Sequence, residues 1–474
     1  MRQHRSHSKV VATIGPATAS KEILAKLFHE GVDVCRLNFS HGTHAEHLAV
    51  INNILELNQE LNATVAILAD LQGPKIRIGE VENNKIELIE GKDVSFVTEK
   101  CIGTATKLYL SYLDFPKDVN IGDSILVDDG KLKLEVISTN KIDTVKTKVI
   151  YGGFLSSKKG VNLPNTKISI PSLTEKDIED ANFALDNNVD WIALSFVRSA
   201  DDLVHLKEII RNKKKFARII AKIEKPEAML DIDNIIDISN GIMVARGDLG
   251  VEVPFDQVPL IQKDLVKRCI AKGKPVIIAT QMMESMITNF RPTRAEANDV
   301  ANAVFDGADA LMLSAETSAG KYPVEAVIAM QRIIDWTEKE FVYNRETLPK
   351  VNSRTFLPDS ICLNACRMAS QTNARAIVTF TYSGYTAFSI SSYRPEAAIY
   401  VFTRNKTLLR KMSLVWGVRA YYYDEHEDMD DAIKYSIDFL KSLNQIAEGD
   451  VVVHVGSTPF EEKGQTNMVK LSYI

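Results

Sequence analysis

The sequence predicts an α/β protein: a (β/α)8 TIM barrel that is interrupted by an all-β lid domain and followed by a C-terminal doubly wound α/β domain. Three observations predict this fold. Eight short apolar runs are each followed by a helical pattern, a long stretch of period-two alternation separates the third run from the fourth, and α/β alternation returns near the C-terminus. Parallel strands that are covered on the outside consist of continuous Val, Ile and Leu runs, so the first observation favours a barrel.

The eight barrel strands are predicted where the apolar runs fall. These runs cover residues 9–15, 32–40, 64–71, 191–197, 218–224, 241–248, 275–281 and 308–314. A helical pattern over residues 322–340 follows the eighth run and completes the alternation. We therefore assign residues 1–72 and 170–340 to the barrel.

The third and fourth predicted strands lie about 120 residues apart, which is too far for an ordinary βα crossover. Between them, five stretches alternate apolar and polar residues and are separated by Gly and Asp turns, and we predict a strand in each: "KIELIEG", "DVSFVTE", "SILVDDG", "KLKLEVI" and "TVKTKVIYGG". We predict an inserted β-rich lid domain over residues 73–169, above the C-terminal mouth of the barrel, where the active sites of this fold lie.

The C-terminal part of the chain returns to α/β alternation after a connection that contains Pro and Asn. The runs "RAIVTFT", "AAIYVFT", "VRAYYYD" and "DVVVHVG" are the predicted strands, and "NMVKLSYI" is a final strand-like segment. These runs predict a third, doubly wound domain over residues 341–474.

Composition bounds the class of protein. The 474 residues are 45% apolar and 25% charged, which is typical of a soluble protein of two or three domains. A net charge of −5 gives no indication of nucleic-acid partners, no apolar run approaches the length of a membrane span, and the basic N-terminus lacks a signal-peptide core. Five scattered cysteines favour reduced thiols, so we expect a cytoplasmic protein.

Polar residues gather at the carboxyl ends of the predicted barrel strands. On a strand, residues two apart face the same way, so Arg36, Asn38 and Ser40 share one face, as do Lys222 and Glu224. The full set is Arg36, Asn38, Ser40, Asp70, Lys222, Glu224, Arg246, Asp248, Thr280, Ser314 and Glu316. Because these ends meet at one rim of a barrel, the set predicts a composite active site.

The chemistry of this set indicates a small anionic substrate and a metal ion. Glu224 and Asp248 are hard oxygen ligands suited to Mg²⁺ or Mn²⁺. Arg36, Lys222 and the hinge residues Lys75 and Arg77 in "ADLQGPKIRI" supply positive charge for phosphate and carboxylate groups. Positioning and charge neutralisation of this kind are most of what phosphoryl transfer requires.

Three features allow other interpretations. His41, His44 and His47 recur at intervals of three like a zinc cluster, although histidines in the first turn of a helix explain the spacing better. Lys222 could form a Schiff base, although the neighbouring Glu224 favours its ammonium form. Cys362 and Cys366 lie one helical turn apart and could bind a metal, but buried core thiols are the simpler interpretation.

Longer motifs link the predicted site to a known family. They are "TIGPAT", "RLNFSHGTH", "DLQGPKIRIG", "KGVNLP", "KIEKPEA", "VARGDLGVE", "ATQMMESM", "PTRAEANDVANAVFDGADALMLSAET" and "AGKYPVEAV". With these motifs the chain resembles the pyruvate kinase family over essentially its whole length. The resemblance implies transfer of the phosphoryl group of phosphoenolpyruvate to ADP, giving pyruvate and ATP. It also implies a homotetramer built from barrel and C-terminal contacts.

The resemblance also implies roles for the rim residues. Glu224 and Asp248 would bind the divalent metal, and Lys222 would stabilise the enolate and the transferring phosphoryl group. Thr280 would lie near the face where C3 of enolpyruvate is protonated, either as the donor or as part of a water relay. Arg36 and Arg77 would contact phosphate, the main-chain amides of Gly247 and Asp248 would hold the carboxylate, and Ser314 and Glu316 resemble a supporting relay. The nucleotide would meet Arg36, Asn38, His41, Arg77 and Asp129, the last of these from the lid.

Two positions depart from the common pattern of the family. Ser199 follows Arg198 where many members have a basic residue, so one nucleotide contact is not carried over. Lys75 stands where potassium-requiring members typically have Glu, and Leu71 and Gln72 replace their Thr-Lys pair, so the chain resembles the potassium-independent branch. Asn38, Ser40, Asp70 and the Leu71 carbonyl would form a cage for a monovalent cation. Our hypothesis is that the Lys75 ammonium replaces K⁺.

A hydroxyl-rich turn in the C-terminal domain is a candidate effector site. The turn contains Thr381, Ser383, Gly384 and Thr386 at the start of a predicted helix, and such a turn can hold phosphate or act as an ordinary N-cap. Tyr382 and Tyr385 add no charge, and the late loop "GSTPFEEKGQT" adds two glutamates. We therefore favour a sugar monophosphate or AMP over fructose 1,6-bisphosphate.

Two other functions share parts of this pattern. A metal-dependent aldolase or dikinase-type barrel shares paired carboxylates but lacks the interrupting lid and the "RLNFSHGT" strand. A degenerate metabolite-binding regulator would have no need for the intact set of Arg36, Arg77, Lys222, Glu224, Asp248 and Thr280. An assay for ADP-dependent formation of pyruvate distinguishes the three functions.

Overall fold

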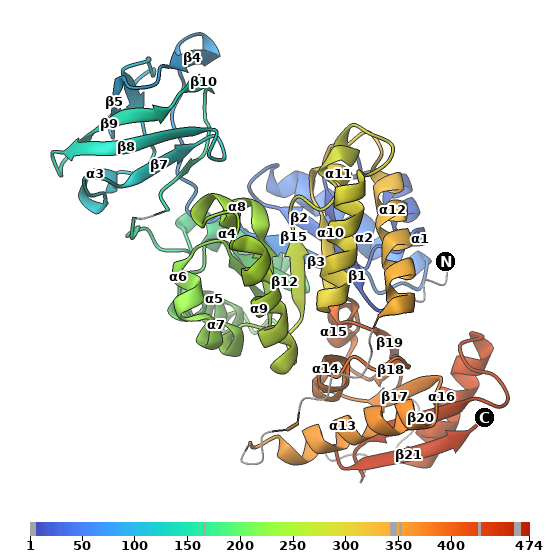
Figure 1. Cartoon of the computed structure of the whole chain (residues 1–474). Coiled ribbons are helices and arrows are strands. Elements are labelled where there is room, and N and C mark those ends of the chain that lie inside the picture. The colour runs from blue at the N-terminus through green and yellow to red at the C-terminus, as the bar shows by residue number, and fades with distance from the viewer. Residues whose placement is uncertain (1–5, 165, 342–347, 350–352, 425–427, 459–465) are drawn as a thin grey trace.

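A computed structural model describes residues 6–164, 166–341, 348–349, 353–424, 428–458 and 466–474. It contains a closed barrel, a β-rich unit that projects from one end of it, and an α/β unit at the other end (Figure 1). The predicted fold class is therefore confirmed, including the insertion between the third and fourth barrel strands. In the described part of the chain no helix is both long and apolar enough to cross a bilayer.

Each of the eight predicted barrel strands is present. They are β1 (Lys9–Ile14), β2 (Val34–Asn38), β3 (Ala66–Asp70), β12 (Trp191–Leu194), β13 (Arg218–Ile223), β14 (Gly241–Ala245), β15 (Val276–Ala279) and β16 (Ala310–Leu313). All neighbours pair in parallel and β1 closes the ring against both β2 and β16. Alternate residues form two cores, since Val11 and Trp191 fill the inside whereas Val10 and Ile192 pack against the helices.

Helices surround the barrel. They are α1 (Lys21–His29), α2 (His44–Glu60), α4 (Glu175–Asp186), α5 (Asp201–Asn212), α6 (Glu227–Leu230), α7 (Ile232–Ile238), α8 (Arg246–Glu252), α9 (Val258–Ala271), α10 (Arg294–Asp306), α11 (Ala315–Ser318) and α12 (Pro323–Thr337), with 3₁₀ turns η2 (Glu284–Ile287) and η3 (Glu338–Glu340). Capping boxes begin α2, α4 and α10. In α4 the capping residue Asp177 also accepts a hydrogen bond from the Gly73 amide at 3.0 Å, which fixes the start of the hinge into the lid.

The inserted unit has its own sheet and core. Its elements are η1 (Glu82–Asn84), β4 (Lys85–Leu88), β5 (Asp93–Val97), β6 (Lys107–Tyr109), α3 (Phe115–Asp118), β7 (Ser124–Val127), β8 (Leu132–Thr139), β9 (Thr144–Tyr151), β10 (Gly153–Ser156) and β11 (Val161–Asn162). Six strands form one sheet in the order β11-β7-β8-β9-β5-β6, and β10 pairs with β4. The five predicted strands are present, whereas the short β6, β10 and β11 were not predicted.

The C-terminal unit is a five-stranded sheet covered on both faces. Its elements are α13 (Phe356–Gln371), β17 (Ala376–Phe380), α14 (Tyr385–Ser392), β18 (Ala398–Thr403), α15 (Lys406–Leu409), η4 (Arg410–Leu414), β19 (Val418–Tyr422), α16 (Met429–Ser442), β20 (Val451–Gly456) and β21 (Met468–Tyr473). The strand order is β19-β18-β17-β20-β21, with only β21 antiparallel. One core contains Cys362 and Cys366 together with residues of α14, and the other contains Ala432 and Leu440 of α16.

The C-terminal unit closes the lower end of the barrel. Leu414, at the end of η4, belongs to the same buried cluster as the residues inside the barrel. Arg410 forms an ion pair with Asp190 just before β12 (2.9 Å), and Arg394 forms one with Asp309 just before β16 (2.9 Å). Figure 1 shows α14 and α15 at this junction, opposite the end that carries the lid.

Candidate active site

Lys222 lies at the centre of the upper rim, between two acids and a hydroxyl. Its Nζ is 2.8 Å from Glu224 and 3.2 Å from Asp70, and it donates a hydrogen bond to the Ser195 hydroxyl at 2.7 Å. Burial alone would lower the pKa of Lys222, but the two carboxylates outweigh it and hold the pKa above its usual value. Lys222 is therefore an ammonium at neutral pH, which disfavours the Schiff-base alternative.

Arg36 and Asp70 face each other across β2 and β3. The Arg36 Nε donates to Asp70 at 2.7 Å, and its Nη1 donates to the Thr13 hydroxyl at 2.9 Å, so the guanidinium is fixed with donors left over. Asp70 is 1% exposed. Burial opposes its ionisation, yet Lys222 and Arg36 lower the pKa of Asp70 below its usual value. This acid holds two cations in place.

Glu224 and Asp248 meet the requirement for a hard cation. Glu224 Oε2 accepts a hydrogen bond from the Phe196 amide at 2.9 Å, whereas its buried Oε1 lies 2.8 Å from the Lys222 ammonium and has no other donor among the residues that the structure describes. Burial, and then the nearby negative charge of Asp248, keep the pKa of Glu224 above its usual value despite Lys222. Two neighbouring carboxylates that repel each other fit Mg²⁺ or Mn²⁺.

Thr280 is held in a strained conformation directly after β15. Its φ is +66°, which is rare for a β-branched residue, and Gln281 follows with a φ of +54°. The Thr280 hydroxyl donates to the Ala279 carbonyl at 2.6 Å and accepts from the Gly247 amide at 2.7 Å. A Cβ on Gly247 would lie 3.2 Å from that hydroxyl, so only glycine fits comfortably. Strain of this kind typically occurs at functional sites.

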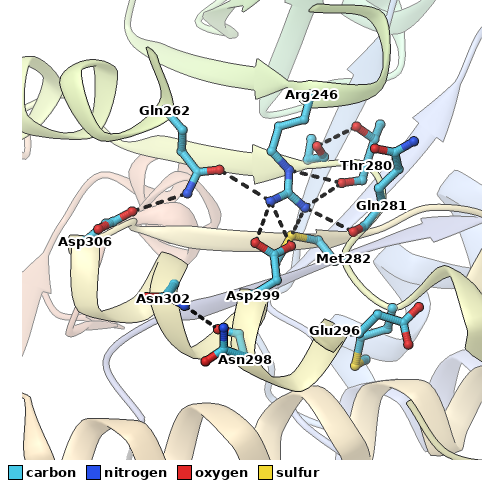
Figure 2. A network of polar contacts seen from close by, with 12 residues as sticks. Arg246, Gln262, Thr280, Gln281, Met282, Glu296, Asn298, Asp299, Asn302 and Asp306 are labelled. Carbon is cyan, nitrogen blue, oxygen red and sulfur yellow. Dashed lines mark hydrogen bonds and ion pairs between the residues drawn. The ribbon is translucent and has the colours of Figure 1, made fainter. Parts of the chain in front are cut away.

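Arg246 holds this strained turn in place. Figure 2 shows its guanidinium between the turn and α10: it donates to the carbonyls of Thr280 (2.8 Å) and Gln281 (3.1 Å) and forms an ion pair with Asp299 (2.8 Å). The sequence pattern places Arg246 at the rim but indicates no role for it. Its partner Asp299 was missed because nothing in a helical pattern indicates which distant loop a helix residue contacts.

Ser314 and Glu316 lie behind the turn. Glu316 is 2% exposed, and its carboxylate accepts hydrogen bonds from the amides of Met283 (3.1 Å) and Ser314 (2.7 Å). Burial raises the pKa of Glu316 in spite of these hydrogen bonds. The hydroxyl of Ser314 is buried and has no hydrogen-bond partner among the residues that the structure describes. The pair thus links the ends of β15 and β16.

The lid and the rim border a cavity of about 280 Å³. Lys75, Arg77 and Asp129 line it from the lid and its hinge, and Asp248 lines it from the barrel. Asp129 stands in a tight turn with a φ of +56° and is exposed. Arg77 is fixed by a hydrogen bond from its Nη1 to the Lys158 carbonyl at 3.0 Å. Residues predicted for the site therefore line this cavity from both the lid and the barrel.

Lys75 has no carboxylate within 4 Å among the described residues, but it interacts electrostatically with several. Burial lowers the pKa of Lys75, and the ammonium of Lys222 adds to this, while Asp248, Glu224 and Asp70 act in the opposite direction. The Lys75 ammonium therefore lies within electrostatic range of the acids of the rim.

Two oxygen atoms of the predicted cation cage already accept hydrogen bonds from the protein. The Leu71 carbonyl accepts from the Ser195 hydroxyl at 2.7 Å, and the Asn38 side-chain oxygen accepts from the Ser40 amide at 3.1 Å. His41 follows and lies on the surface, where partial burial and the cations Lys75, Arg77 and Arg36 lower its pKa.

The other two histidines of the "HGTHAEH" motif have separate partners. His44 contacts Asp180 at 2.7 Å and stacks on Phe183, whereas His47 stacks on Phe39. No group of three metal-ligating His, Cys, Asp or Glu side chains occurs within the described ranges. The zinc alternative gains no support. All five cysteines are free, and Cys362 and Cys366 are core thiols.

Two further contacts of the site were not predicted from the sequence. Ser195 connects Lys222 to the Leu71 carbonyl, and its place at the end of β12 could have revealed it. Asn162 of β11 donates to Glu252 at 2.9 Å, and Glu252 forms a buried ion pair with Lys225 at 2.7 Å. The second contact ties the lid to α8, the helix that carries Asp248.

The candidate effector turn is well formed. The Gly384 amide donates to the Thr381 hydroxyl at 3.1 Å, and Gly384 has a φ of +88°. The Thr386 hydroxyl contacts that of Thr466 at 2.8 Å, while Ser383 is exposed. The late loop over residues 456–466 falls largely outside the described residues, including both of its glutamates.

Together these features are a parallel barrel with a cluster of buried charged side chains at its upper rim, next to a β-rich unit, with a cavity between the two. Comparison with known proteins gives the family. The family model "Pyruvate kinase, barrel domain" matches residues 5–327, and "Pyruvate kinase, alpha/beta domain" matches residues 359–472. The chain belongs to the pyruvate kinase family, whose members are phosphotransferases.

Relatives support this assignment over nearly the full chain. A pyruvate kinase from Geobacillus stearothermophilus is 44% identical over 98% of this chain and 80% of its own length. One from Clostridium acetobutylicum is 41% identical over 98% of this chain and 99% of its own length. The crystal structure of a pyruvate kinase from Cryptosporidium parvum superposes with a TM-score of 0.93 at 36% identity, covering 99% of this chain and 96% of that one.

Proposed function

We propose that this chain transfers the phosphoryl group of phosphoenolpyruvate to ADP, giving pyruvate and ATP, as in the final step of glycolysis. The observation that carries the proposal is the position of Lys222, a buried ammonium held by Asp70, Glu224 and Ser195 where strands from three parts of the barrel meet. A fixed cation in a buried site stabilises developing negative charge without reorganisation, which suits both an enolate and a transferring phosphoryl group.

Glu224 and Asp248 hold Mg²⁺ or Mn²⁺ in this proposal. When bound, the ion neutralises phosphate and enolate oxygens and acts as a Lewis acid. The support is the burial of Glu224 Oε1, whose one charged partner is Lys222 in the described structure, and the mutual repulsion of the two acids. Lys222 keeps Glu224 oriented from the other side.

The remaining rim residues bind and orient the substrate. Arg36 and Arg77 contact phosphate, and the amides of Gly247 and Asp248 hold the carboxylate at the start of α8. The Gly247 amide now donates to the Thr280 hydroxyl, so substrate carboxylate would compete for this donor and release that hydroxyl toward C3. Ser314 and Glu316 support the turn that carries Thr280.

The nucleotide lies on the lid side. Arg36, Asn38, His41, Arg77 and Asp129 contact ADP in this proposal. Two of these, Arg77 and Asp129, already line the cavity between lid and rim. Closure of the lid would bring Asp129 nearer and exclude water.

Potassium independence follows from Lys75 in our hypothesis. Its ammonium is within electrostatic range of Asp70, and the Leu71 carbonyl of the cage is already bonded to Ser195. Activity in tetramethylammonium buffer should match activity in K⁺ buffer, and Lys75→Glu should create a K⁺ requirement. A hundredfold loss in the unmodified chain without K⁺ would refute the hypothesis.

Regulation by a phosphorylated metabolite at Thr381, Ser383, Gly384 and Thr386 is a further part of the proposal. The support is the left-handed Gly384 turn before α14 and the exposed Ser383. A sugar monophosphate or AMP is favoured over fructose 1,6-bisphosphate. Titrating each against the half-saturation concentration of phosphoenolpyruvate tests the choice.

We also propose a cytoplasmic homotetramer. An apolar groove on α12, lined by Ile328, Ile333 and Trp336, continues onto Phe290, and Trp336 is 68% exposed. Exposed apolar surface of this kind suits a contact between barrels. Sedimentation velocity of the wild type and of Trp336→Glu measures the assembly.

The experiment that tests the reaction is an assay of pyruvate coupled to lactate dehydrogenase, run with and without ADP and with and without Mg²⁺. We expect pyruvate only when phosphoenolpyruvate, ADP and the metal are all present. Pyruvate formed without ADP would indicate a phosphatase, and no pyruvate under any condition would indicate a non-catalytic relative.

A further inference from the structure

Two short segments join the lid to the barrel, and both contact the same turn. The outgoing segment, residues 71–75, follows β3, and the returning segment, residues 166–174, leads to α4. The turn consists of Ser195 and Phe196, directly after β12. Its serine contacts Lys222 and its phenylalanine amide contacts the next acid along the neighbouring strand β13. The turn therefore connects the lid to the charged residues of the rim.

The backbone of Phe196 is strained and is held on both sides. Its φ is +55°, which is rare for a bulky residue. The Phe196 amide donates to Glu224 Oε2 at 2.9 Å, and the Phe196 carbonyl accepts from the Ser172 hydroxyl at 2.8 Å. Ser172 belongs to the returning segment and is 1% exposed, so water does not compete for this hydrogen bond. A strained backbone persists only where its surroundings fix it, and these two contacts do so.

The outgoing segment packs directly against the same turn. A Cβ on Gly73 would lie 2.7 Å from Cδ2 of Phe196 and 2.8 Å from Cβ of Ser195. Gly73 also has a φ of +69°, so only glycine suits this position. The ring of Phe196 is thus confined by the start of the lid, while its carbonyl is held by the return from the lid.

Arg198 holds the returning segment to the barrel. Its guanidinium donates to the carbonyl of Ile168 and, at 2.9 Å, to the carbonyl of Ile170. The side chains of these two isoleucines pack against the lid core. Asp202 of α5 lies 3.6 Å from the guanidinium and accepts from the Arg198 amide at 2.8 Å. Arg198 therefore fixes the position of the segment that presents Ser172.

We propose that Ser172 and Arg198 are positioning residues for the carboxylate of Glu224, and that they act through the strained backbone of Phe196. The inference deepens the proposed function and rests on it, because it takes Glu224 as a ligand of the divalent metal. Hydrogen bonds to a ligating carboxylate fix its orientation and thereby raise its affinity for the metal. Without the Ser172 hydroxyl, Phe196 would relax toward an ordinary φ and its amide would turn away from Glu224.

Ser172 acts indirectly in this inference. Phe196 and Arg198 line the cavity between lid and rim, whereas Ser172 is buried and is absent from the lining. A change at Ser172 should therefore alter how the metal is held, and should leave the groups that bind substrate in place.

The test measures binding of Mn²⁺ to the full-length chain without substrates, by electron paramagnetic resonance. Ser172→Ala should weaken Mn²⁺ binding by about tenfold. Arg198→Gln should weaken it by about threefold, because Arg198 acts one step further from Glu224. Ser169→Ala is the matched control: Ser169 lies on the same segment but donates to Asp118 within the lid at 2.8 Å. It should change Mn²⁺ binding by less than about twofold.

Steady-state kinetics give a second measurement. In Ser172→Ala the Mg²⁺ concentration for half-maximal activity should rise by the same factor as the Mn²⁺ dissociation constant, and kcat at saturating Mg²⁺ should fall much less. A purely structural role would lower the thermal midpoint without this separation. Calorimetry shows whether each variant folds, and Arg198→Gln decides the question if Ser172→Ala does not.

Unchanged Mn²⁺ affinity in the folded variants, or an equal loss in Ser169→Ala, would overturn the inference. Glu224→Gln separates it from the proposed function. Mn²⁺ binding that is lost in Glu224→Gln but kept in Ser172→Ala and Arg198→Gln would contradict this inference and leave the proposed metal site intact. Absence of Mn²⁺ binding by the unmodified chain would contradict both.

Discussion

Buried arginine–aspartate pairs occur at both ends of the barrel, but their surroundings differ. At the lower end every carboxylate oxygen of Asp190 and Asp309 has a donor: Arg410 and Ile67 for the first, Arg394, Val276 and Trp416 for the second. At the upper end Glu224 Oε1 and the Ser314 hydroxyl are buried without hydrogen-bond partners in the described structure, and Thr280 is strained. The acids of the lower end are therefore fully paired within the fold, whereas the upper end leaves polar groups for a substrate and a metal.

The largest expected effect that separates the two ends comes from Glu224→Gln. Losing one of two metal-binding carboxylates should lower kcat by about a thousandfold. The midpoint of thermal unfolding of the metal-free protein at pH 8 should stay the same or rise, because a buried charge with a raised pKa has been removed. Steady-state kinetics and differential scanning calorimetry measure both. A large fall in the midpoint would show that Glu224 is structural.

Arg394→Met should lower the stability and leave kcat nearly unchanged, which is the opposite of the change expected for Glu224→Gln. It leaves the Asp309 carboxylate buried without its cation, which typically costs about 3–5 kcal/mol in the free energy of unfolding. We expect kcat of the folded fraction to change less than threefold, since the pair lies at the far end from Lys222. The double variant Arg394→Met with Asp309→Asn should recover part of the stability. Loss of kcat with unchanged stability would invalidate the comparison.

The two ends should also respond differently to pH. The pKa of Glu224 is raised in the folded chain, so the folded state binds more protons than the unfolded state between the ordinary value of 4.5 and the raised one. The contribution of Glu224 to the stability of the metal-free protein therefore decreases as pH rises through that window. Metal affinity should follow the reverse trend and weaken as pH falls. Calorimetry with and without Mg²⁺ from pH 5 to 8 measures both trends, and Glu224→Gln should flatten them.

The smallest expected effect compares one serine from each end. Ser314→Ala removes a buried hydroxyl without a partner, so the free energy of unfolding should change little or increase by up to about 1 kcal/mol. Ser413→Ala removes the hydroxyl that donates to the Thr64 carbonyl and should cost about 1 kcal/mol. Urea denaturation of the two variants side by side is the measurement. Equal losses would mean that Ser314 has a structural partner.

Local sequence patterns were sufficient to predict the barrel strands and the polar residues at their ends. Apolar runs located all eight barrel strands, and polar residues at their ends located Lys222, Glu224 and Asp248. Partners distant in the chain were not predictable in this way. Three acids on ordinary helices and loops illustrate this: Asp299 contacts Arg246, Glu252 contacts Asn162, and Asp309 contacts Arg394. Only the packing of the barrel brings each acid to its partner. The short strands β6, β10 and β11 are likewise fixed by pairing and not by periodicity.

The most direct test of the central claim follows the phosphorus atom by ³¹P NMR in a mixture of phosphoenolpyruvate, ADP and Mg²⁺, with the unmodified chain and with Lys222→Met. We predict that the unmodified chain converts the phosphoenolpyruvate signal into that of the γ-phosphate of ATP, and that Lys222→Met, with an unchanged circular dichroism spectrum, does so at least a thousandfold more slowly. Transfer by the variant at a near-normal rate, or release of inorganic phosphate by the unmodified chain, would contradict this account.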